Sequence, residues 1–357
     1  MEFFKKDTKR ALEAKYEAQK IAFGPIVFQA AKCLRDLGIL ELIESSRDQG
    51  MTEEEVATKL GLSHYGARVL MEAGLGMGLL CVNDEKYTTT KTSYFLLRDK
   101  MTIANMDFVH DICYKGMFDL KASILNGKPE GLKVFGEQWN TLYEALSTLP
   151  EQAKKSWFSF DHFYSDIAFP EVLPHIFKHK INQIFDVGGN TGKFSIQCAG
   201  HDPNIKVTIL DLPGQLAMAA KNIKEAGFDD RVNGHPINLL DENQAFPKGA
   251  DIVWMSQFLD CFSEPEIVSI LKRAKTALVE DGAIYILETY WDRQQYEAAA
   301  FSLQQTSLYF TNIANGNSQM YHSKNMIKCI HEAGLYIEED IDNIGISHTL
   351  FRCKVKK

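Results

Sequence analysis

The sequence predicts an α/β protein, with a doubly wound seven-stranded sheet in its C-terminal half and a mostly helical domain in front of it. From Ile184 onward, short β-branched runs alternate with amphipathic helical patterns, which is typical of a mostly parallel sheet covered by helices on both faces. Before about residue 175 the pattern is one helix after another. A length of 357 residues allows two domains of ordinary size.

Composition narrows the class of protein. The formal net charge of −8 argues against a broad nucleic-acid surface, because phosphate contacts need clustered Lys and Arg. The seven cysteines are scattered and form no CxxC pair, and no His, Asp or Glu cluster has metal-ligand spacing, so we expect no metal. No run approaches the roughly 18 apolar residues that span a bilayer, and the charged N-terminus lacks a signal-peptide core. We therefore expect a cytoplasmic protein without membrane or nucleic-acid partners.

Two segments organise the N-terminal region. The segment Ile21–Ile43 is apolar around most of its circumference, so we expect a helix buried on most faces, partly against a second copy in a homodimer. In Thr52–Tyr94, Thr52 and Glu55 form a capping box, a second helix follows, and two short strands flank a turn at 83–85. Helix, turn, helix and hairpin together predict a winged-helix module.

A winged helix raises the question of DNA binding. The expected recognition helix carries only His64 and Arg68 as contacts, and Glu72 opposes them, whereas groove-entering helices normally carry several cationic or amide side chains. We therefore interpret residues 1–100 as a dimerisation domain, and a DNA-binding regulator that senses its small-molecule ligand is the alternative. Residues 101–175 are expected to be a helical connector that contributes to the substrate pocket.

A glycine loop opens the second half of the chain. The run D-V-G-G-N-T-G at 186–192 follows a short apolar strand, and Asp211 ends the next strand, where an acid accepts hydrogen bonds from ribose hydroxyls. The dinucleotide frame G-x-G-x-x-G does not fit Gly188, Gly189 and Gly192. Asp186, directly before the glycines, would repel a pyrophosphate and suits a cationic ligand. The methionine part of S-adenosylmethionine, with its ammonium and sulfonium, fits this pattern.

The remaining strands complete the predicted sheet. We expect strands at 235–240, 250–259 and 283–290, a helix from Ser263 that stops at Gly282, and two final strands without a helix between them. Ligands bind at the carboxyl ends of such strands. Asn238, Asp260 and Glu288 fall near those ends.

The chain resembles the plant caffeate-type and hydroxyindole O-methyltransferases and their bacterial polyketide and phenazine relatives. The resemblance rests on the D-V-G-G-x-x-G loop, the LDLP run at 210–213, the strand before Ser263-Glu264-Pro265-Glu266, and the winged-helix front end, in this order. It implies a Rossmann-like class I methyltransferase catalytic domain at 176–357. It also implies S-adenosylmethionine as the methyl donor and S-adenosylhomocysteine as its product.

The resemblance implies a cofactor site, residue by residue. The glycine loop would hold the methionine portion and Asp211 the ribose, with Leu212 beside the adenine. Asn238 and Leu239 stand where the family typically has Asp-Met near the adenine, and Ser256 stands where plant members often carry a lysine. The complete predicted set is Asp186, Gly188, Gly189, Gly192, Asp211, Leu212, Asn238, Leu239, Ser256 and Gln257.

The catalytic positions depart from the family pattern. Where the family usually has His-Asp-Trp, with the His as base, this chain has Asp260-Cys261-Phe262. Glu288 matches the first of two carboxylates that flank the His, and Gln319 stands at the second if 316–321 matches the family's G-G-x-E-R-T run. A carboxylate with an ordinary pKa near about 4 is a weak base for a phenol, but burial would make it stronger. We therefore hypothesise that Asp260 orients or deprotonates an aromatic hydroxyl, aided by Glu288.

These observations predict methyl transfer to a small aromatic acceptor, with oxygen favoured as the acceptor atom. Methylation of carbon or nitrogen, and a non-catalytic protein that only binds the cofactor, are the alternatives that the missing His leaves open. Aromatic and polar side chains from two regions are expected to wall the acceptor site: Phe158, His162, Trp291, Tyr309 and Phe310.

Overall fold

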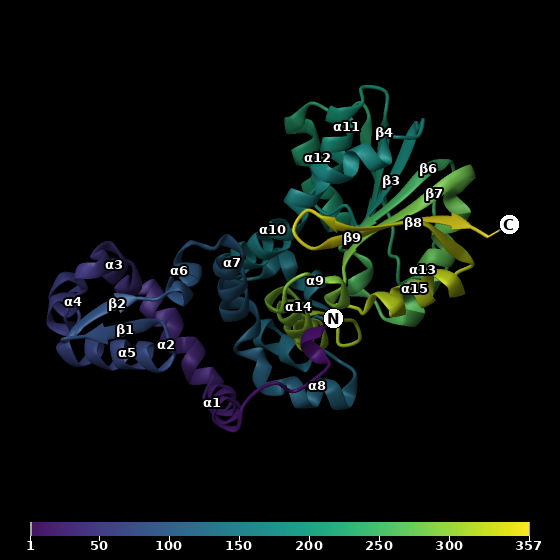
Figure 1. The fold of residues 1–357 in the computed structure, drawn as a ribbon. Coiled ribbons are helices and arrows are strands. Elements are labelled where there is room, and N and C mark those ends of the chain that lie inside the picture. Colours follow the sequence, from purple (N-terminus) through teal and green to yellow (C-terminus); the bar gives the residue numbers. More distant parts are fainter. Residues whose placement is uncertain (1, 357) are drawn as a thin grey trace. The chain divides into compact units, whose positions relative to one another are not determined.

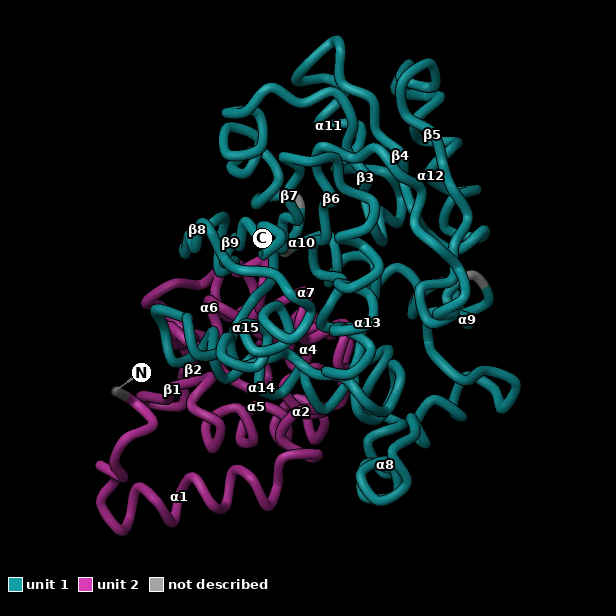
Figure 2. Tube along the Cα trace, turned by 90° about the vertical axis from the view of Figure 1, so that its right-hand side faces the viewer, with its two compact units in different colours: residues 1, 110–357 teal, residues 2–109 magenta. Residues whose placement is uncertain are grey.

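A computed structural model describes residues 2–356, which form two compact units, Glu2–Val109 and His110–Lys357 (Figures 1 and 2). The chain divides after Val109 because each of the two parts packs mainly against itself. The domain boundaries that the sequence predicts, after residues 100 and 175, stay predictions.

The N-terminal unit consists of short helices and one hairpin. Its elements are η1 (Glu2–Phe4), α1 (Ala11–Ala22), α2 (Gly24–Asp36), α3 (Ile39–Ser45), η2 (Arg47–Gln49), α4 (Glu53–Leu60), α5 (His64–Gly76), β1 (Leu80–Asn83), β2 (Lys86–Thr89), α6 (Lys91–Arg98) and α7 (Lys100–Phe108).

Local signals in the sequence account for several of these boundaries. Glu55 N–H donates to Thr52 Oγ1 at 3.2 Å and Thr52 N–H donates to Glu55 Oε2 at 2.8 Å, so the predicted capping box opens α4. Gly66 N–H donates to Ser63 Oγ at 3.0 Å and opens α5. The antiparallel strands β1 and β2 flank the predicted turn, where Asp84 and Glu85 have φ of 46° and 64°. A buried apolar cluster that includes Leu34 and Met71 holds the unit together.

The second unit combines short helices with a seven-stranded sheet. Its elements are η3 (Val109–Cys113), η4 (Gly116–Asp119), α8 (Leu120–Asn126), η5 (Glu130–Phe135), α9 (Leu142–Ala145), η6 (Leu146–Thr148), α10 (Glu151–Ile176), β3 (Gln183–Val187), α11 (Lys193–His201), β4 (Lys206–Asp211), α12 (Pro213–Ala226), β5 (Val232–Pro236), β6 (Ala250–Ser256), η7 (Leu259–Cys261), α13 (Glu264–Ala274), η8 (Lys275–Ala277), β7 (Leu278–Thr289), η9 (Trp291–Arg293), α14 (Glu297–Tyr309), η10 (Phe310–Ala314), α15 (Ser323–Glu332), β8 (Leu335–Ile344) and β9 (His348–Val355).

The sheet has the strand order β5-β4-β3-β6-β7-β9-β8. Strands β3 to β7 pair in parallel, whereas β9 pairs antiparallel with both β7 and β8. The predicted seven-stranded, doubly wound sheet with a terminal antiparallel hairpin is confirmed. The strand order reverses between β4 and β6, on either side of β3, which puts a ligand site at the carboxyl end of this strand.

Helices cover both faces of this sheet (Figure 1). Along β6, Ile252 and Trp254 pack into a buried cluster with α10, α11 and α12, while Val253 and Met255 pack into a second cluster with α13 and α15. Alternate residues of a strand point to opposite faces. The near-continuous apolar run of β6 is therefore what a strand covered on both sides requires.

Several predicted elements were wrong. The segment Ile21–Ile43, expected as one helix buried on most faces, is divided among α1, α2 and α3, and its side chains Ile21 and Ile26 are exposed. The strand expected at 250–259 ends at Ser256. The third strand is Val232–Pro236 rather than 235–240, because β4 ends at Asp211, which lies opposite Pro236. Asn238 and Leu239 therefore lie in the loop after the strand. Gly282 does not end a helix: α13 ends at Ala274, and Gly282 lies within β7.

Between residues 2 and 356, no helix is both long and apolar enough to cross a bilayer. The same described residues bring together no group of three or more His, Cys, Asp or Glu side chains that could hold a metal ion.

Candidate active site

The loop between β3 and α11 needs glycine at two positions. Gly188 has a φ of +70° and its N–H donates to the Leu210 carbonyl at 2.9 Å. A Cβ at this position would lie 2.2 Å from Cδ2 of Phe258, far inside van der Waals contact. Gly192, with a φ of +80°, is the N-cap residue of α11. The loop therefore brings bare backbone to the carboxyl end of β3.

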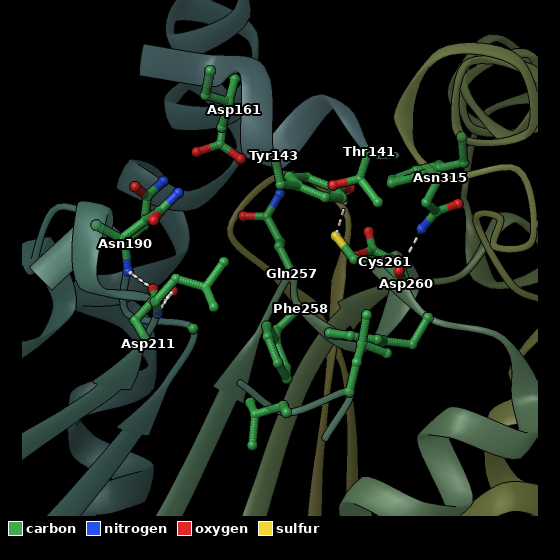
Figure 3. Close-up of a pocket in the computed structure, with 18 of the residues that line it drawn as sticks. Thr141, Tyr143, Asp161, Asn190, Asp211, Gln257, Phe258, Asp260, Cys261 and Asn315 are labelled. Carbon is green, nitrogen blue, oxygen red and sulfur yellow. Dashed lines mark hydrogen bonds between the residues drawn. The ribbon is translucent and has the colours of Figure 1, made fainter. Parts of the chain in front are cut away.

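Asp211 lies at the carboxyl end of β4, beside this loop (Figure 3). One carboxylate oxygen accepts the N–H of Asn190 at 2.9 Å and the other accepts the N–H of Leu212 at 2.7 Å. Burial raises the pKa of Asp211, although both backbone hydrogen bonds oppose the shift. Each oxygen keeps lone pairs for a ligand, so the carboxylate can accept hydrogen bonds from a pair of hydroxyls.

Asp186 has a different environment. Its Oδ2 accepts a hydrogen bond from Ser195 Oγ at 2.6 Å, and a Cβ at Gly189 would lie 2.7 Å from the same oxygen. Asp186 is not among the residues that line the neighbouring cavity. Burial raises its pKa to about 7. Its carboxylate ties β3 to α11 beneath the loop, and a direct role toward a cationic ligand stays a prediction from the sequence.

A cavity of about 440 Å³ lies at the carboxyl ends of β3, β4, β6 and β7 (Figure 3). All residues that line it belong to the unit His110–Lys357. This is the expected position for a ligand site in a doubly wound sheet, and the volume is in the range of small-molecule sites. Nine of the predicted site residues line it: Gly188, Asp211, Leu212, Asn238, Leu239, Gln257, Asp260, Tyr309 and Phe310.

Gln257 is held in an unusual conformation at the cavity wall. Its φ of +47° is uncommon for a residue with a side chain, and its N–H donates to the Leu287 carbonyl at 2.9 Å. Its buried Oε1 has no hydrogen-bond partner among the described residues. A buried acceptor without a partner is costly, so a bound ligand that donates here would stabilise this loop.

Asp260 and Glu288 are both buried and form an acid pair. Asp260 lines the cavity, whereas Glu288 does not. Glu288 Oε1 accepts the N–H groups of Phe258 and Leu259 at 2.9 and 2.8 Å, which orients the turn that carries Asp260. Burial and the Asp260 charge together raise the pKa of Glu288 well above its usual value, whereas burial raises the pKa of Asp260 to about 6. Ionisation of one carboxylate opposes ionisation of the other, and the directions of the two shifts favour the proton on Glu288.

A chain of hydrogen bonds connects Asp260 to two neutral groups (Figure 3). The Tyr143 hydroxyl donates to Cys261 Sγ at 3.0 Å, and this thiol lies 3.5 Å from Asp260 Oδ1. Burial raises the pKa of both Tyr143 and Cys261, so both stay protonated. The thiol proton therefore points toward Asp260 and favours its ionised form.

Asn315 fixes the same turn from a third segment of the chain. Its Nδ2 donates to the Cys261 carbonyl at 2.5 Å and to Ser318 Oγ at 2.8 Å. Sequence reasoning missed Tyr143, Cys261 and Asn315 as site residues. Only Cys261 had a signal, its position directly after the expected base.

The aromatic helix α10 turns a different face to the cavity than predicted. Trp157, Phe160 and Asp161 line the cavity, and Trp157 Nε1 donates to the Tyr309 hydroxyl at 2.9 Å. The rings of Phe158 and His162 lie 5.5 Å apart and pack against each other outside the lining. The predictions for Phe158 and His162 are therefore corrected: residues four apart share one helix face, and it is not the face toward the cavity.

Six other predicted residues also lie outside the cavity lining: Gly189, Gly192, Ser256, Glu288, Trp291 and Gln319. The ring of Trp291 packs edge-on against His322, with centroids 4.9 Å apart. Gln319 is exposed, while Ser318 and Met320 on either side are buried. Ser256 is partly buried at the end of β6. We therefore do not assign Gln319 the place of a second flanking carboxylate, and Asn315 is the polar side chain that this segment brings to the site.

Two family models match the chain. A model described as a Dimerisation2-like domain matches residues 15–87, and a model described as an O-methyltransferase domain matches residues 117–335.

Two relatives with named activities are both methyltransferases. The chain is 26% identical over 275 residues to the L-tyrosine C(3)-methyltransferase of Streptomyces lavendulae, covering 75% of this chain and 73% of the relative. It is 24% identical over 239 residues to the 3-hydroxy-5-methyl-1-naphthoate 3-O-methyltransferase of Streptomyces sahachiroi, covering 67% of each. The solved structure of the S-adenosylmethionine-dependent methyltransferase SibL has the same fold, with a TM-score of 0.71, 24% identity, and 95% and 98% of the two chains covered.

Proposed function

Because the chain belongs to the O-methyltransferase domain family, which uses S-adenosylmethionine as methyl donor, we propose that it methylates a hydroxyl oxygen of a small aromatic acceptor. The observation that carries this proposal is Asp260, a buried carboxylate that lines the apolar end of the cavity and has a pKa raised to about 6. It stands at the family's base position.

The residues near β3 and β4 fit the donor. Asp211 would accept from the ribose hydroxyls, and the bare backbone at Gly188 leaves room for the methionine portion. Asn238 Oδ1 already accepts the N–H of Leu240 at 3.0 Å, and its second lone pair is left for the adenine amino group. Ser256 and Gly192 would act by shaping the loops. The donor supplies a methyl group activated by its sulfonium, and every other step belongs to the protein.

The other end of the cavity suits a flat ring. Trp157, Leu303, Tyr309, Phe310 and Met320 line it, and apolar walls with a few placed polar groups are typical of sites for aromatic small molecules. Holding the acceptor oxygen in line with the methyl group supplies a large part of the rate in a displacement of this kind.

Asp260 would take the acceptor's proton as the new bond forms. A carboxylate with a pKa near 6 is a stronger base than an exposed one, and it is still ionised at neutral pH. Protonated Glu288 avoids a second negative charge and holds the turn through two backbone N–H groups. General-base catalysis typically contributes a factor of about 10² to 10⁴.

The test replaces Asp260 with Asn and measures label transfer from methyl-labelled donor to a panel of phenols. We expect turnover to fall about 10² to 10⁴-fold, with the calorimetric affinity for S-adenosylhomocysteine close to wild type. The matched control is Asp229→Asn, which removes an exposed carboxylate from the same unit. Wild-type turnover in Asp260→Asn would remove Asp260 from the mechanism.

Carbon is the second candidate for the acceptor atom. The family's usual His is absent at Asp260, and the relative from Streptomyces lavendulae is named a C(3)-methyltransferase. A deprotonated phenol is nucleophilic at oxygen and at the ortho carbon, and methylation of carbon then requires loss of the ring proton. Nuclear magnetic resonance of the labelled product distinguishes the two, since O-methyl and aryl-methyl groups have different shifts.

We also propose that residues 1–100 form a homodimerisation domain, with 101–175 as a connector to the catalytic domain at 176–357. The Dimerisation2-like match supports this, as do the exposed side chains Leu12, Ile21 and Ile26 on α1 and α2. Light scattering should give the mass of a dimer for the wild type and of a monomer for the double variant Ile21→Glu, Ile26→Glu.

The cytoplasm is the compartment we propose, in keeping with seven free cysteines.

A further inference from the structure

Helix α14 does not end in an ordinary α-helical turn. It continues into the π-helical turn η10, in which the N–H of Asn315 donates to the Phe310 carbonyl at 3.1 Å, five residues back. Turns of this kind are rare and are frequently found at functional sites. Both ends of η10 face the site: Phe310 lines the cavity, and the Asn315 side chain donates to the Cys261 carbonyl (Figure 3).

Asn312 holds the middle of this turn from outside the cavity lining. Its side chain is fully buried, its Nδ2 donates to the Gly116 carbonyl at 2.7 Å, and its Oδ1 accepts the hydroxyl of Ser123 at 2.6 Å. The Ser123 hydroxyl is also buried and accepts the N–H of Glu130 at 2.9 Å. Both ends of the Asn312 amide are therefore bonded to a segment that lies 189 to 196 residues earlier in the chain.

The backbones come very close around this amide. A Cβ at Gly131 would lie well inside van der Waals contact with Nδ2 of Asn312, and a Cβ at Gly116 would do the same with the side chain of Ile313. The Cβ at Gly116 would also lie 2.7 Å from the Gly131 carbonyl oxygen. The hydrogen bonds of the amide and this close packing together fix the π-helical turn against the segment 116–131.

From this arrangement we infer that Asn312 is a positioning residue for methyl transfer. The inference rests on the proposed function and concerns the same site. Asn312 would act through Phe310, which forms part of the wall for the acceptor ring, and through Asn315, which holds the turn that carries Asp260. A misplacement of about 1 Å can lower a rate about 100-fold, so hydrogen bonds outside the cavity can decide turnover.

The cofactor end of the cavity is held by different bonds. Asp211 accepts the N–H groups of Asn190 and Leu212, and Gly188 donates to the Leu210 carbonyl, so the glycine loop and the end of β4 hold each other. Loss of the Asn312 amide should therefore weaken catalysis on the acceptor without weakening binding of the cofactor product. A general loss of stability would not produce this split.

The experiment replaces Asn312 with Ala and measures kcat/KM for the best phenol of the label-transfer panel. We expect kcat/KM to fall about 10- to 100-fold, while the calorimetric Kd for S-adenosylhomocysteine stays close to wild type. The matched control is Gln183→Ala, which removes a side-chain amide that donates to Thr208 Oγ1 at 3.1 Å at the amino end of β3, away from the cavity. Wild-type kcat/KM in Asn312→Ala, or equal losses of kcat/KM and of cofactor affinity, would overturn the inference.

Ser123→Ala tests the same contact from the other side. It removes the hydroxyl that donates to Asn312, so kcat/KM should fall in the same direction with cofactor affinity again unchanged. In the double variant the two losses should be smaller than their product, because both substitutions break one shared interaction. Losses that multiply would show that the two residues act independently and would contradict the inference. Should Asn312→Ala fail to fold, the split expected for Ser123→Ala decides the question alone.

Hydrogen exchange separates this inference from the proposed function, since it needs no acceptor. In Asn312→Ala or Ser123→Ala, the backbone N–H groups of 310–316 and 258–262 should exchange faster, while those of 186–192 keep the wild-type rate. A protein with this exchange pattern that methylates no phenol would contradict only the function. A protein that methylates phenols but shows wild-type exchange at 258–262 in both variants would contradict only the inference.

Discussion

The two ends of the cavity differ in how the chain builds them. The end near β3 and β4 depends on a seven-residue loop and one strand-end acid. Asp211 lies 21 residues after Asn190 of the loop and accepts its backbone N–H. The end near Asp260 brings together Tyr143, Cys261, Asn315 and Tyr309, which come from distant parts of the sequence. A site made from local backbone geometry can be recognised in one sequence, whereas a site assembled by tertiary packing cannot.

The largest expected effect comes from a change in the glycine loop, at the end of the cavity near β3 and β4. Gly188→Val places a side chain against the Phe258 ring and forces a β-branched residue into a φ of +70°. We expect calorimetry to show weaker binding of S-adenosylhomocysteine, and turnover to fall at least about 100-fold, because a 1 Å misplacement of reacting groups alone can cost that much in rate.

The control for this variant is Gly214→Ala. A Cβ at Gly214 meets no atom within 4 Å, and Gly214 lies in the first turn of α12. Affinity for the cofactor product should stay near wild type. Tight binding by Gly188→Val would show that the loop does not position the cofactor.

A smaller loss is expected when only the ribose contact changes. Asp211→Asn keeps the size of the side chain but replaces one oxygen by an NH₂ group. This group is a donor and would face the N–H donor of Asn190 or Leu212. Hydrogen bonds to charged groups contribute about 1.5–3 kcal/mol, so the Kd for S-adenosylhomocysteine should rise about 10- to 100-fold. Calorimetry with adenosine alone should show the same ratio, and a change limited to the intact cofactor product would contradict a ribose contact.

The same contrast explains how much of the structure the sequence could predict. The capping boxes at Thr52 and Ser263 and the glycine loop involve neighbouring residues, so their patterns survive without tertiary information. The third strand was misplaced because its ends are set by pairing with β4, not by its own residues. Helix α10 has aromatic residues on several faces, so periodicity alone could not choose between Trp157 and Phe158.

At the end of the cavity near Asp260, the thiol of Cys261 should affect the pH at which turnover is lost. The folded-state pKa of Asp260 is raised to about 6, so the ionised base is present above this pH and is lost below it. Cys261→Ala removes a hydrogen bond that favours the ionised form, so the pKa of Asp260 should rise further. The acidic limb of the kcat profile should move upward in pH by roughly half a unit.

Tyr143→Phe provides a graded comparison for that shift. It removes the hydroxyl that donates to the Cys261 sulfur but leaves the thiol beside Asp260, so its acidic limb should move less than that of Cys261→Ala. A limb that moves to lower pH in either variant would contradict the orientation of the hydrogen-bond chain. Loss of turnover without any shift would assign these residues to acceptor binding instead.

The smallest expected effect concerns Gln319, the residue for which a position inferred from the family pattern disagrees with the fold. The segment from Asn315 to Tyr321 has no regular secondary structure, so neither a helical nor a strand period indicates which side chains point inward. Asn315 and Ser318 bond to each other, and Asn315 also donates to the Cys261 carbonyl, while Gln319 is exposed. Gln319→Ala should therefore keep kcat/KM within about twofold of wild type, since a surface side chain away from the acceptor contributes little.

Asn315→Ala, which removes the hydrogen bond to the Cys261 carbonyl, should lower kcat/KM by about 10-fold, since a lost buried hydrogen bond costs about 1–3 kcal/mol. If the two variants exchanged these effects, the alignment of this segment with the family run would be right and the packing around Asn315 would be irrelevant to turnover.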